Sequence, residues 1–322
     1  MPSPQPAAAA PAAPAAPLPA EGTSSRPGTD SSRRLLAPEA EARPLTLWGS
    51  SSMSSEGGAA ATPLAVRIHE HLALAAAPAV VHAYGVGATR SEHTLLMRGL
   101  DTPQLRRLGD PAPQTGAVRV SLDSDLSPVG TLQIPGDLAG VPGVLDGRDH
   151  AWHFTPDDPA QPLTDGTFRS ALADVAAGSR QVLWVGKNNI LDVSAVLEHT
   201  QRLWDAAAEP AHDTLVLGQW PTPHDPVGSS TAEAVAAVNE EQERRYGEHF
   251  LDLGGLLTSD EGLCCPPLAP LRLLEQATTQ EALAQQIVPA ALRAPDDIHL
   301  NGWGNLAVSW AIVRRMRELG WL

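Results

Sequence analysis

Short apolar runs alternate along most of the chain with longer segments in which apolar and polar residues follow a helical period. The apolar runs, each a predicted strand, lie at 45–48, 80–84, 181–185, 214–217 and 249–253. The amphipathic segments, each a predicted helix, lie at 62–77, 192–208, 230–246 and 304–319. Strands that alternate with helices form a mainly parallel sheet with helices on both faces, so we predict a three-layer α/β/α sandwich.

The segment from 115 to 155 breaks this rhythm. It contains AVRVSL, TLQIPGDLAGVPGVLDG and HAWHFTP, in which apolar and polar residues alternate between Gly, Pro and Asp turns. Period-two alternation with such turns is typical of antiparallel strands. We therefore expect a small β-rich insertion at 101–165, which interrupts a domain spanning 44–322.

Alanine and proline dominate the first part of the chain, which begins MPSPQPAAAAPAAPAAPLPA. Recurrent proline without periodic apolar positions predicts a disordered linker over 1–43. This N-terminus has neither the basic region nor the strongly apolar region of a signal peptide. Linkers of this kind often tether exported proteins, so a secreted or cell-surface location is compatible with the sequence, which leaves the compartment open.

The net charge of the 322 residues is −15. Nucleic acids and anionic membrane surfaces both bind clustered Lys and Arg, so this charge disfavours both partners. No apolar run has the length of a membrane span. The two cysteines, Cys264 and Cys265, are adjacent, which suits neither a disulfide across a loop nor a zinc site. The sequence predicts no cofactor and leaves the oligomeric state open.

A serine-rich turn follows the first predicted strand, in LTLWGSSSMSSEGG. A sharp turn from strand to helix can expose a hydroxyl at the sheet edge, and a neighbouring base would make that hydroxyl a nucleophile. A helix that begins there would supply oriented N–H groups. The candidates are Ser50, Ser51, Ser52 and Ser54, and the same pattern is typical of an ordinary loop.

Two further loops carry groups that can stabilise an oxyanion. HAYGVGATRS contains Gly85 and Gly87, which allow a tight turn, but it completes neither a phosphate-binding loop nor a dinucleotide fingerprint. VLWVGKNNI places Asn188 after a strand, where a side-chain N–H can stabilise developing negative charge. A cap of the helix expected at 192–208 is the alternative role of this asparagine.

The loop APDDIHLNGWG near the C-terminus holds Asp296 and His299, three residues apart. A carboxylate that accepts the imidazole N–H fixes the histidine tautomer and stabilises the imidazolium. Asp297 is a competing acid, and surface decoration or half of a metal site are alternative interpretations. Other metal ligands are not evident, because His69 and His71 lack the i, i+4 spacing of a helical site.

Taken together, these blocks resemble those of the SGNH (GDSL-like) hydrolase superfamily over residues 44–322. That family has a nucleophile turn of the Gly-Asp-Ser or Gly-Gln-Ser-Asn-Met type, a Gly-rich second block, a Gly-x-Asn third block and a closing Asp-x-x-His. The corresponding blocks here are Gly49-Ser50-Ser51-Ser52-Met53, Gly85-Val86-Gly87-Ala88, Gly186-Lys187-Asn188 and Asp296-Asp297-Ile298-His299. The resemblance implies the flavodoxin-like form of the predicted sandwich.

The resemblance also implies a serine ester hydrolase with a catalytic triad. Ser51 would be the nucleophile, His299 the general base and then the general acid, and Asp296 the acid that orients His299. The reaction would pass through an acyl-enzyme without a metal or a cofactor. An acyltransferase would use the same residues, and a non-catalytic cell-surface or phage-structural binding module is a further alternative.

The implied oxyanion hole combines backbone and side-chain donors. Its members would be the N–H groups of Ser51 and Ala88, with Gly87 shaping the turn, and the side-chain amide of Asn188. The sequence departs from the family at Ser50, where Asp or Gln is usual, and at Ala88, where Gly is usual. A positive φ at Ala88 would cost about 1 kcal/mol or more.

Members of this superfamily with such blocks often resemble carbohydrate O-deacetylases, so the expected substrate is a short, acetyl-like acyl ester of a small molecule or a glycan. A general lipase or arylesterase is the second choice. The β insertion resembles one in some bacterial and phage-associated members, where it could shape the substrate cleft, bind a glycan or be purely structural.

Overall fold

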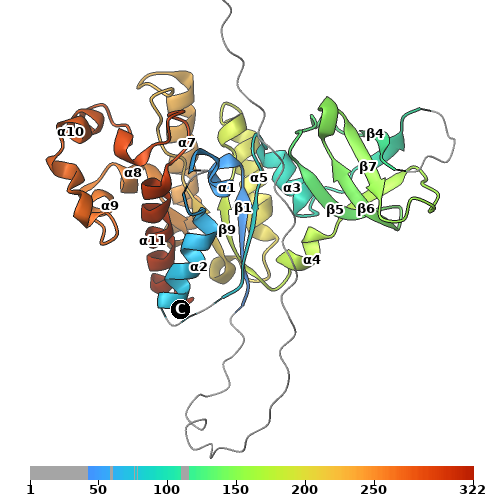
Figure 1. The fold of residues 1–322 in the computed structure, drawn as a ribbon, viewed down its shortest axis with the longest axis horizontal. Coiled ribbons are helices and arrows are strands. Elements are labelled where there is room, and N and C mark those ends of the chain that lie inside the picture. The colour runs from blue at the N-terminus through green and yellow to red at the C-terminus, as the bar shows by residue number, and fades with distance from the viewer. Residues whose placement is uncertain (1–42, 59–60, 76, 78, 110–115) are drawn as a thin grey trace, which may run out of the picture. The chain divides into compact units, whose positions relative to one another are not determined.

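The computed structural model describes residues 43–322, apart from 59–60, 76, 78 and 110–115 (Figure 1). The linker expected over 1–43 therefore lies outside the described residues, except for Arg43. The Arg43 guanidinium donates two hydrogen bonds, of 2.5 and 2.8 Å, to the buried carboxylate of Asp213, and this ion pair anchors the chain just before the first strand. None of the helices within the described ranges is both long and apolar enough to cross a bilayer.

A five-stranded parallel sheet lies at the centre of the fold. Its strands, in spatial order, are β11 (Phe250–Leu251), β10 (Thr214–Leu217), β9 (Arg180–Trp184), β1 (Leu45–Gly49) and β2 (Val81–Gly85). Numbered along the chain, this is the 2-1-3-4-5 order of flavodoxin-like folds. The predicted parallel sheet is confirmed.

Alternate residues of each strand enter two separate hydrophobic cores. Leu47 of β1 and Val182 of β9 pack into one core, whereas the neighbouring Trp48 and Leu183 pack into the other. Successive side chains of a strand point to opposite faces, so a sheet covered on both faces needs apolar residues at consecutive positions. This explains why the strands appear in the sequence as continuous apolar runs rather than as alternating patterns.

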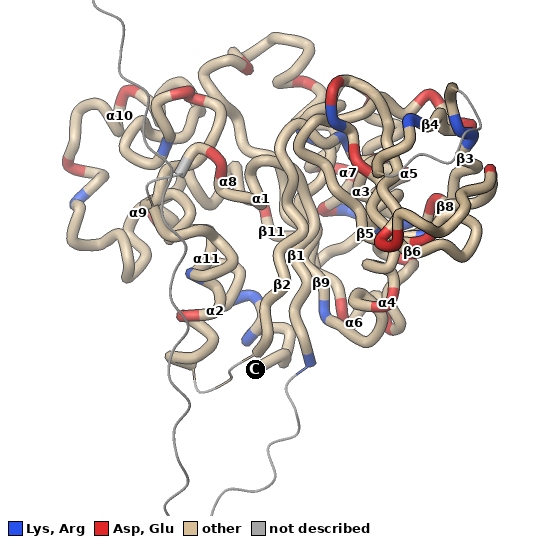
Figure 2. The backbone as a smooth tube through the Cα atoms, turned by 45° about the vertical axis from the view of Figure 1, so that its right-hand side comes forward, with Lys and Arg blue, Asp and Glu red and all other residues tan. Residues whose placement is uncertain are grey.

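Helices cover both faces of the sheet, as Figure 1 and Figure 2 show for α2 and α11 on one side and α3 and α5 on the other. The helices of the first core are α2 (Leu64–Leu74), α8 (Leu253–Leu257) and α11 (Gly302–Glu318). The helices of the second core are α3 (Ser91–Met97), α5 (Val193–Asp205) and α7 (Ser230–Tyr246). The three-layer α/β/α sandwich is therefore confirmed.

Several shorter helices complete this part of the chain. They are α1 (Ser51–Ser54), α4 (Leu172–Ala176), α6 (Pro210–Asp213), α9 (Asp260–Leu263) and α10 (Ala277–Ala284). The strand expected at 249–253 is shorter than predicted. Only Phe250–Leu251 pairs with β10, because the chain enters α8 directly afterwards, where the N–H of Leu256 donates to the carbonyl of Asp252.

Between α3 and α4 the chain forms a closed antiparallel barrel. Its strands are β3 (Gln104–Arg107), β4 (Val118–Leu122), β5 (Gln133–Leu138), β6 (Val141–Asp146), β7 (Trp152–Pro156) and β8 (Gly166–Ser170), in the closed order β3-β4-β7-β6-β5-β8. The antiparallel β structure predicted beside the parallel sheet is thus present, and its strands run from 104 to 170.

The barrel is closed by its first and last strands, which pair through Gln104 with Thr167 and Leu105 with Gly166. Inside it, the rings of Phe154 and Phe168 meet edge to face with centroids 6.3 Å apart. These rings belong to the same hydrophobic core as α3, so the barrel and the helix layer are continuous through buried apolar contacts.

Leu47 tests how much the central strand contributes to stability. Its side chain is completely buried, so Leu47→Ala should lower the free energy of unfolding by about 2–5 kcal/mol through lost burial and a residual cavity. Leu74→Ala is the matched control, because Leu74 ends α2 with 84% of its surface exposed and should change stability by less than about 0.5 kcal/mol. Urea unfolding followed by circular dichroism measures both, and equal effects would contradict the assignment of the core.

Candidate active site

The carboxyl ends of three strands meet at one edge of the sheet. Gly49 at the end of β1 pairs with Gly85 of β2 on one side and with Trp184 of β9 on the other. After β1 the chain crosses to α2 in the first core, whereas after β9 it crosses to α5 in the second core. Open α/β sheets bind ligands at such a switch point, where neighbouring connections leave to opposite faces.

The serine turn begins at this switch point. Ser51 is the first residue of α1 and is 9% exposed, and its N–H donates to no other described residue. The hydroxyl of Ser54 is engaged, because its single hydrogen has two acceptors within reach, the carbonyl oxygen of Ser51 at 2.9 Å and a carboxylate oxygen of Glu56 at 3.3 Å. The tightness of the turn requires Gly49, because a Cβ there would lie 2.5 Å from the carbonyl oxygen of Trp184.

The loop after β2 lies directly against the serine turn. A Cβ on Gly85 would be 2.4 Å from the backbone nitrogen of Ser54, and one on Gly87 would be 2.0 Å from the carboxylate of Glu56. Ala88 has φ +60, so the departure from glycine noted in the sequence leaves a strained residue at this position. The N–H of Ala88 has no acceptor among the described residues.

Asn188 reaches across to the same loop. It lies in a 3-10 turn, Lys187–Asn189, which follows Gly186 in the left-handed region at φ +97. Its Nδ2 donates to the carbonyl of Thr89 at 2.8 Å. An amide nitrogen carries two hydrogens, so this bond fixes the side chain and leaves the second hydrogen for another acceptor. The helix-cap alternative does not apply, since Asp192 caps α5 by accepting from Ala195.

Asp296 and His299 form a hydrogen-bonded pair. The Nδ1 of His299 lies 2.7 Å from Asp296 Oδ2, while Oδ1 of the same carboxylate accepts the N–H groups of Ile298 and His299. Partial burial opposes ionisation of Asp296, but these hydrogen bonds prevail and lower its pKa to about 2. An ionised Asp296 assigns the proton to Nδ1 and leaves Nε2, which has no partner in the described part of the chain, as the basic nitrogen.

Asp297, the alternative acid partner for His299, instead forms an ion pair with Arg293. Its own φ is +58, which turns the chain back at the tip of a short hairpin. An antiparallel bridge joins Arg293 to Leu300, and the N–H of Ala294 donates to the carbonyl of His299 at 2.8 Å. Asp296 and His299 therefore sit on a hairpin with its own backbone hydrogen bonds.

Asn301 ties this hairpin to the last helix. Its side-chain oxygen accepts the N–H groups of Trp303 and Gly304 at the start of α11, and its Nδ2 donates to the carbonyls of Ala291 and Arg293. An Asn directly before an amphipathic segment is a recognisable helix cap in the sequence. That the same side chain also bonds to the hairpin is visible only in the fold.

Close packing joins the hairpin to the serine turn. A Cβ on Gly57, six residues after Ser51, would lie 2.2 Å from the Cβ of His299. The structure thus brings together the segments that carry Ser51, Ala88, Asn188 and the Asp296–His299 pair. No hydrogen bond links the Ser51 hydroxyl to His299 within the described residues, and such bonds often tighten only when substrate binds.

Three contacts at this edge were not found from the sequence. Gly57 packs on His299, the Thr89 carbonyl orients Asn188, and the Nε2 of His224 lies 3.3 Å from the carbonyl oxygen of Asp296. Each depends on a backbone group or on the absence of a side chain, so none produces a recognisable residue pattern. The ranges that the structure covers hold no group of three or more His, Cys, Asp or Glu side chains placed to bind a metal.

Comparisons with known proteins give no family assignment. No family model matches the chain, and no curated protein matches its sequence. Similar solved structures include a lipase/acylhydrolase from Enterococcus faecalis, with a TM-score of 0.43 and 12% identity over 86% of this chain and 96% of that chain. Another has a TM-score of 0.39 and 12% identity over 86% of this chain and 97% of its own. At these scores the likeness carries no conclusion about activity.

The lowered pKa of Asp296 makes stability depend on pH in a defined way. Because the folded-state pKa of about 2 is below the ordinary value of 3.8, the carboxylate stabilises the fold fully above pH 3.8 and loses this effect as the pH falls through about 2. Asp296→Asn should therefore be less stable than the wild type at neutral pH, with a difference that shrinks below pH 3.8. Denaturant unfolding from pH 7 to pH 2 measures it, and a difference that stayed constant down to pH 2 would contradict the ionised pair.

Proposed function

We propose that the protein is a serine ester hydrolase of the SGNH type, in which Ser51, His299 and Asp296 form the catalytic triad. The observation that carries the proposal is the packing of the Asp296–His299 hairpin, through Gly57, on the turn that begins with Ser51 at the switch point of the sheet. This packing supports a triad made of the Ser51 hydroxyl, an imidazole with an uncommitted Nε2 and an ionised carboxylate.

In the proposed reaction, Nε2 of His299 takes the proton of the Ser51 hydroxyl as Oγ attacks the ester carbonyl. Asp296 stabilises the resulting imidazolium through its 2.7 Å hydrogen bond to Nδ1. The imidazolium then protonates the leaving alcohol, and an acyl-enzyme remains on Ser51. A water molecule, deprotonated by His299, then attacks the acyl carbon. The bond from this carbon to Ser51 Oγ breaks, the acid leaves, and the imidazolium returns its proton to Oγ.

The developing oxyanion needs hydrogen-bond donors that are already oriented. The N–H groups of Ser51 and Ala88 have no acceptor in the described structure, and Asn188 has one amide hydrogen beyond the one given to Thr89. The strained φ of Ala88 fits such a role, since strain at a sparsely populated backbone conformation clusters at functional sites. Gly87 allows the loop to approach Glu56 closely, which supports its proposed role in shaping the turn before Ala88.

The proposed substrate is a short acyl ester, with an acetyl-like acyl group on a small molecule or a glycan. Its support is the resemblance of the four blocks to carbohydrate O-deacetylases. The acidic net charge of −15 disfavours strongly anionic substrates.

Ser51→Ala should abolish both hydrolysis of p-nitrophenyl acetate and covalent labelling by a fluorophosphonate probe, because no other hydroxyl takes its place. Ser52→Ala is the matched control, since Ser52 is adjacent in α1 and its hydroxyl forms no hydrogen bond to a described residue. It should retain labelling. Absence of labelling in well-folded wild-type protein would instead indicate a non-catalytic module with this fold.

Asn188→Ala should lower kcat by about 10²–10³, the usual cost of one oxyanion donor, and leave the circular dichroism spectrum and the unfolding midpoint near those of the wild type. Leu191→Ala, three residues away on an exposed side chain, should leave kcat unchanged. A kcat for Asn188→Ala within about threefold of the wild type would remove Asn188 from the mechanism.

A further inference from the structure

Asn189 and Ser91 form a closed pair of hydrogen bonds inside the protein. Nδ2 of Asn189 donates to the hydroxyl of Ser91 at 2.9 Å, and the backbone N–H of Ser91 donates to Oδ1 of Asn189 at 3.1 Å. Asn189 is 8% exposed, and Ser91 is completely buried. The proposed ester hydrolysis assigns no step to either side chain.

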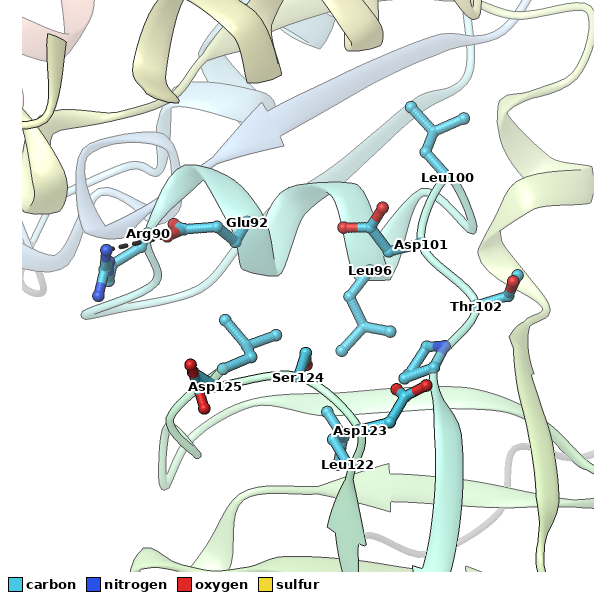
Figure 3. A pocket seen from close by; sticks show the side chains of 12 residues that line it. Arg90, Glu92, Leu96, Leu100, Asp101, Thr102, Leu122, Asp123, Ser124 and Asp125 are labelled. Atoms are coloured by element: carbon cyan, nitrogen blue, oxygen red, sulfur yellow. Dashed lines mark ion pairs between the residues drawn. The ribbon is translucent and has the colours of Figure 1, made fainter. Parts of the chain in front are cut away.

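Ser91 is the first residue of α3, directly after the turn that follows β2. The residues on either side of it, Arg90 and Glu92, are partly exposed and form an ion pair at 2.9 Å, as Figure 3 shows. A backbone N–H in the first turn of a helix has no acceptor within that helix. Asn189 therefore supplies the acceptor that the N–H of Ser91 needs in the interior.

The Asn189–Ser91 pair joins the two loops that carry the side-chain donor and one backbone donor of the proposed oxyanion hole. Asn189 directly follows Asn188 in the 3-10 turn after β9, and Ser91 follows Ala88 by three residues. Asn188 itself donates to the carbonyl of Thr89 at 2.8 Å. Two consecutive asparagines thus bind two residues of the facing loop.

The turn that contains Ala88 is also closed internally. The Thr89 hydroxyl donates to the carbonyl of Val86 at 2.7 Å, which encloses Gly87 and Ala88. Ala88 has φ +60, and a residue in such a conformation persists only where the surrounding structure holds it. Because the turn is closed on itself, a displacement of Thr89 or Ser91 would move the N–H of Ala88 as well.

The hydroxyl of Ser91 has a further partner on α5, since it lies 2.8 Å from Nδ1 of His199. Asn189 donates to this hydroxyl, so the hydrogen of the hydroxyl is free for Nδ1. A serine beside a histidine is also the arrangement of a nucleophile and its base. Ser91 is completely buried, however, so a substrate cannot reach it, and its contacts make it part of the support of the loops.

We propose that Asn189 and Ser91 are positioning residues, which set the distance between the Ala88 N–H and the Asn188 amide across the oxyanion hole. An oxyanion is stabilised most by donors that are oriented before the reaction, and a misplacement of about 1 Å can cost about 10²-fold in rate. The inference rests on the proposed function, because the pair acts through the donors of that reaction.

Asn189→Leu replaces the amide by an apolar side chain of similar size. We expect kcat for p-nitrophenyl acetate to fall about 10- to 30-fold while KM changes by less than about twofold, because the donors act on the transition state. Gln181→Leu is the matched control, since Gln181 is a buried amide near the other end of β9, where it donates to Leu203 and Thr214. It should keep the kcat of the wild type. Equal losses in both variants would contradict a specific role of Asn189.

Ser91→Ala is a second variant, which decides the question if Asn189→Leu folds poorly. It removes only the hydroxyl, and alanine is a good helix former at this position. We expect kcat to fall about three- to tenfold, again without a change in KM, because the N–H of residue 91 can still donate to Asn189. A kcat equal to that of the wild type in the folded variants would overturn the proposal.

A double-mutant cycle separates positioning from an independent effect on the fold. If Asn189 acts through Asn188, the variant that combines Asn188→Ala with Asn189→Leu should have a kcat within about threefold of that of Asn188→Ala alone. Losses that multiply in the combined variant would show that the two residues act independently, and would overturn the proposed route.

Hydrogen exchange measures the pair without turnover. In Asn189→Leu the amide of residue 91 loses its acceptor and should exchange at least about tenfold faster, whereas the amides of α11 should be unchanged. Exchange at the wild-type rate would overturn the pair. Wild-type protein that is not labelled by the fluorophosphonate probe would remove the proposed function and the catalytic role of the pair together. Active, labelled protein whose kcat is insensitive to both substitutions would overturn this inference alone.

Discussion

The parallel pairing of β1 with both of its neighbours is the constraint on which the rest of the structure depends. It aligns Gly49 with Gly85 and with Trp184, so three connections leave the sheet at one level. A slip of one residue would exchange Leu47 and Trp48 between the two cores and would move the serine turn away from its partners. Core packing and the geometry of the site are therefore fixed by the same register.

The sequence predicted the fold class and most strands and helices of the sandwich because their signals are local. Continuous apolar runs reflect burial on both faces of a strand, and amphipathic periods reflect burial on one face of a helix; the segment expected to be helical at 192–208, for example, forms α5 (Val193–Asp205). The segment at 249–253 shows the limit of such reasoning. Its apolar residues fit a strand or a helix equally, and the contact of Phe250–Leu251 with β10 decides between them.

For the candidate site, the sequence predicted which side chains would carry chemistry, and the structure adds the contacts that hold those side chains in place. The sequence left Asp296 and Asp297 as alternative partners of His299. In the structure, Asp296 forms the hydrogen bond to His299, and Asp297 forms an ion pair with Arg293. The catalytic roles remain a proposal. The contact of Gly57 with His299 could not be predicted, because the two residues are far apart in the chain. The contact also requires a residue without a side chain at position 57, and this requirement leaves no pattern in the sequence.

The pairing of β3 with β8 places the entry and the exit of the barrel side by side. A segment whose two ends are neighbours can be gained, lost or exchanged as a cassette, because the flanking α3 and α4 need not move to accommodate it. The parallel sheet would retain its register through such an exchange, while the barrel side of the core shared with α3 would be replaced. In this architecture, the barrel and the sheet that positions the candidate site are free to evolve on separate segments of one chain.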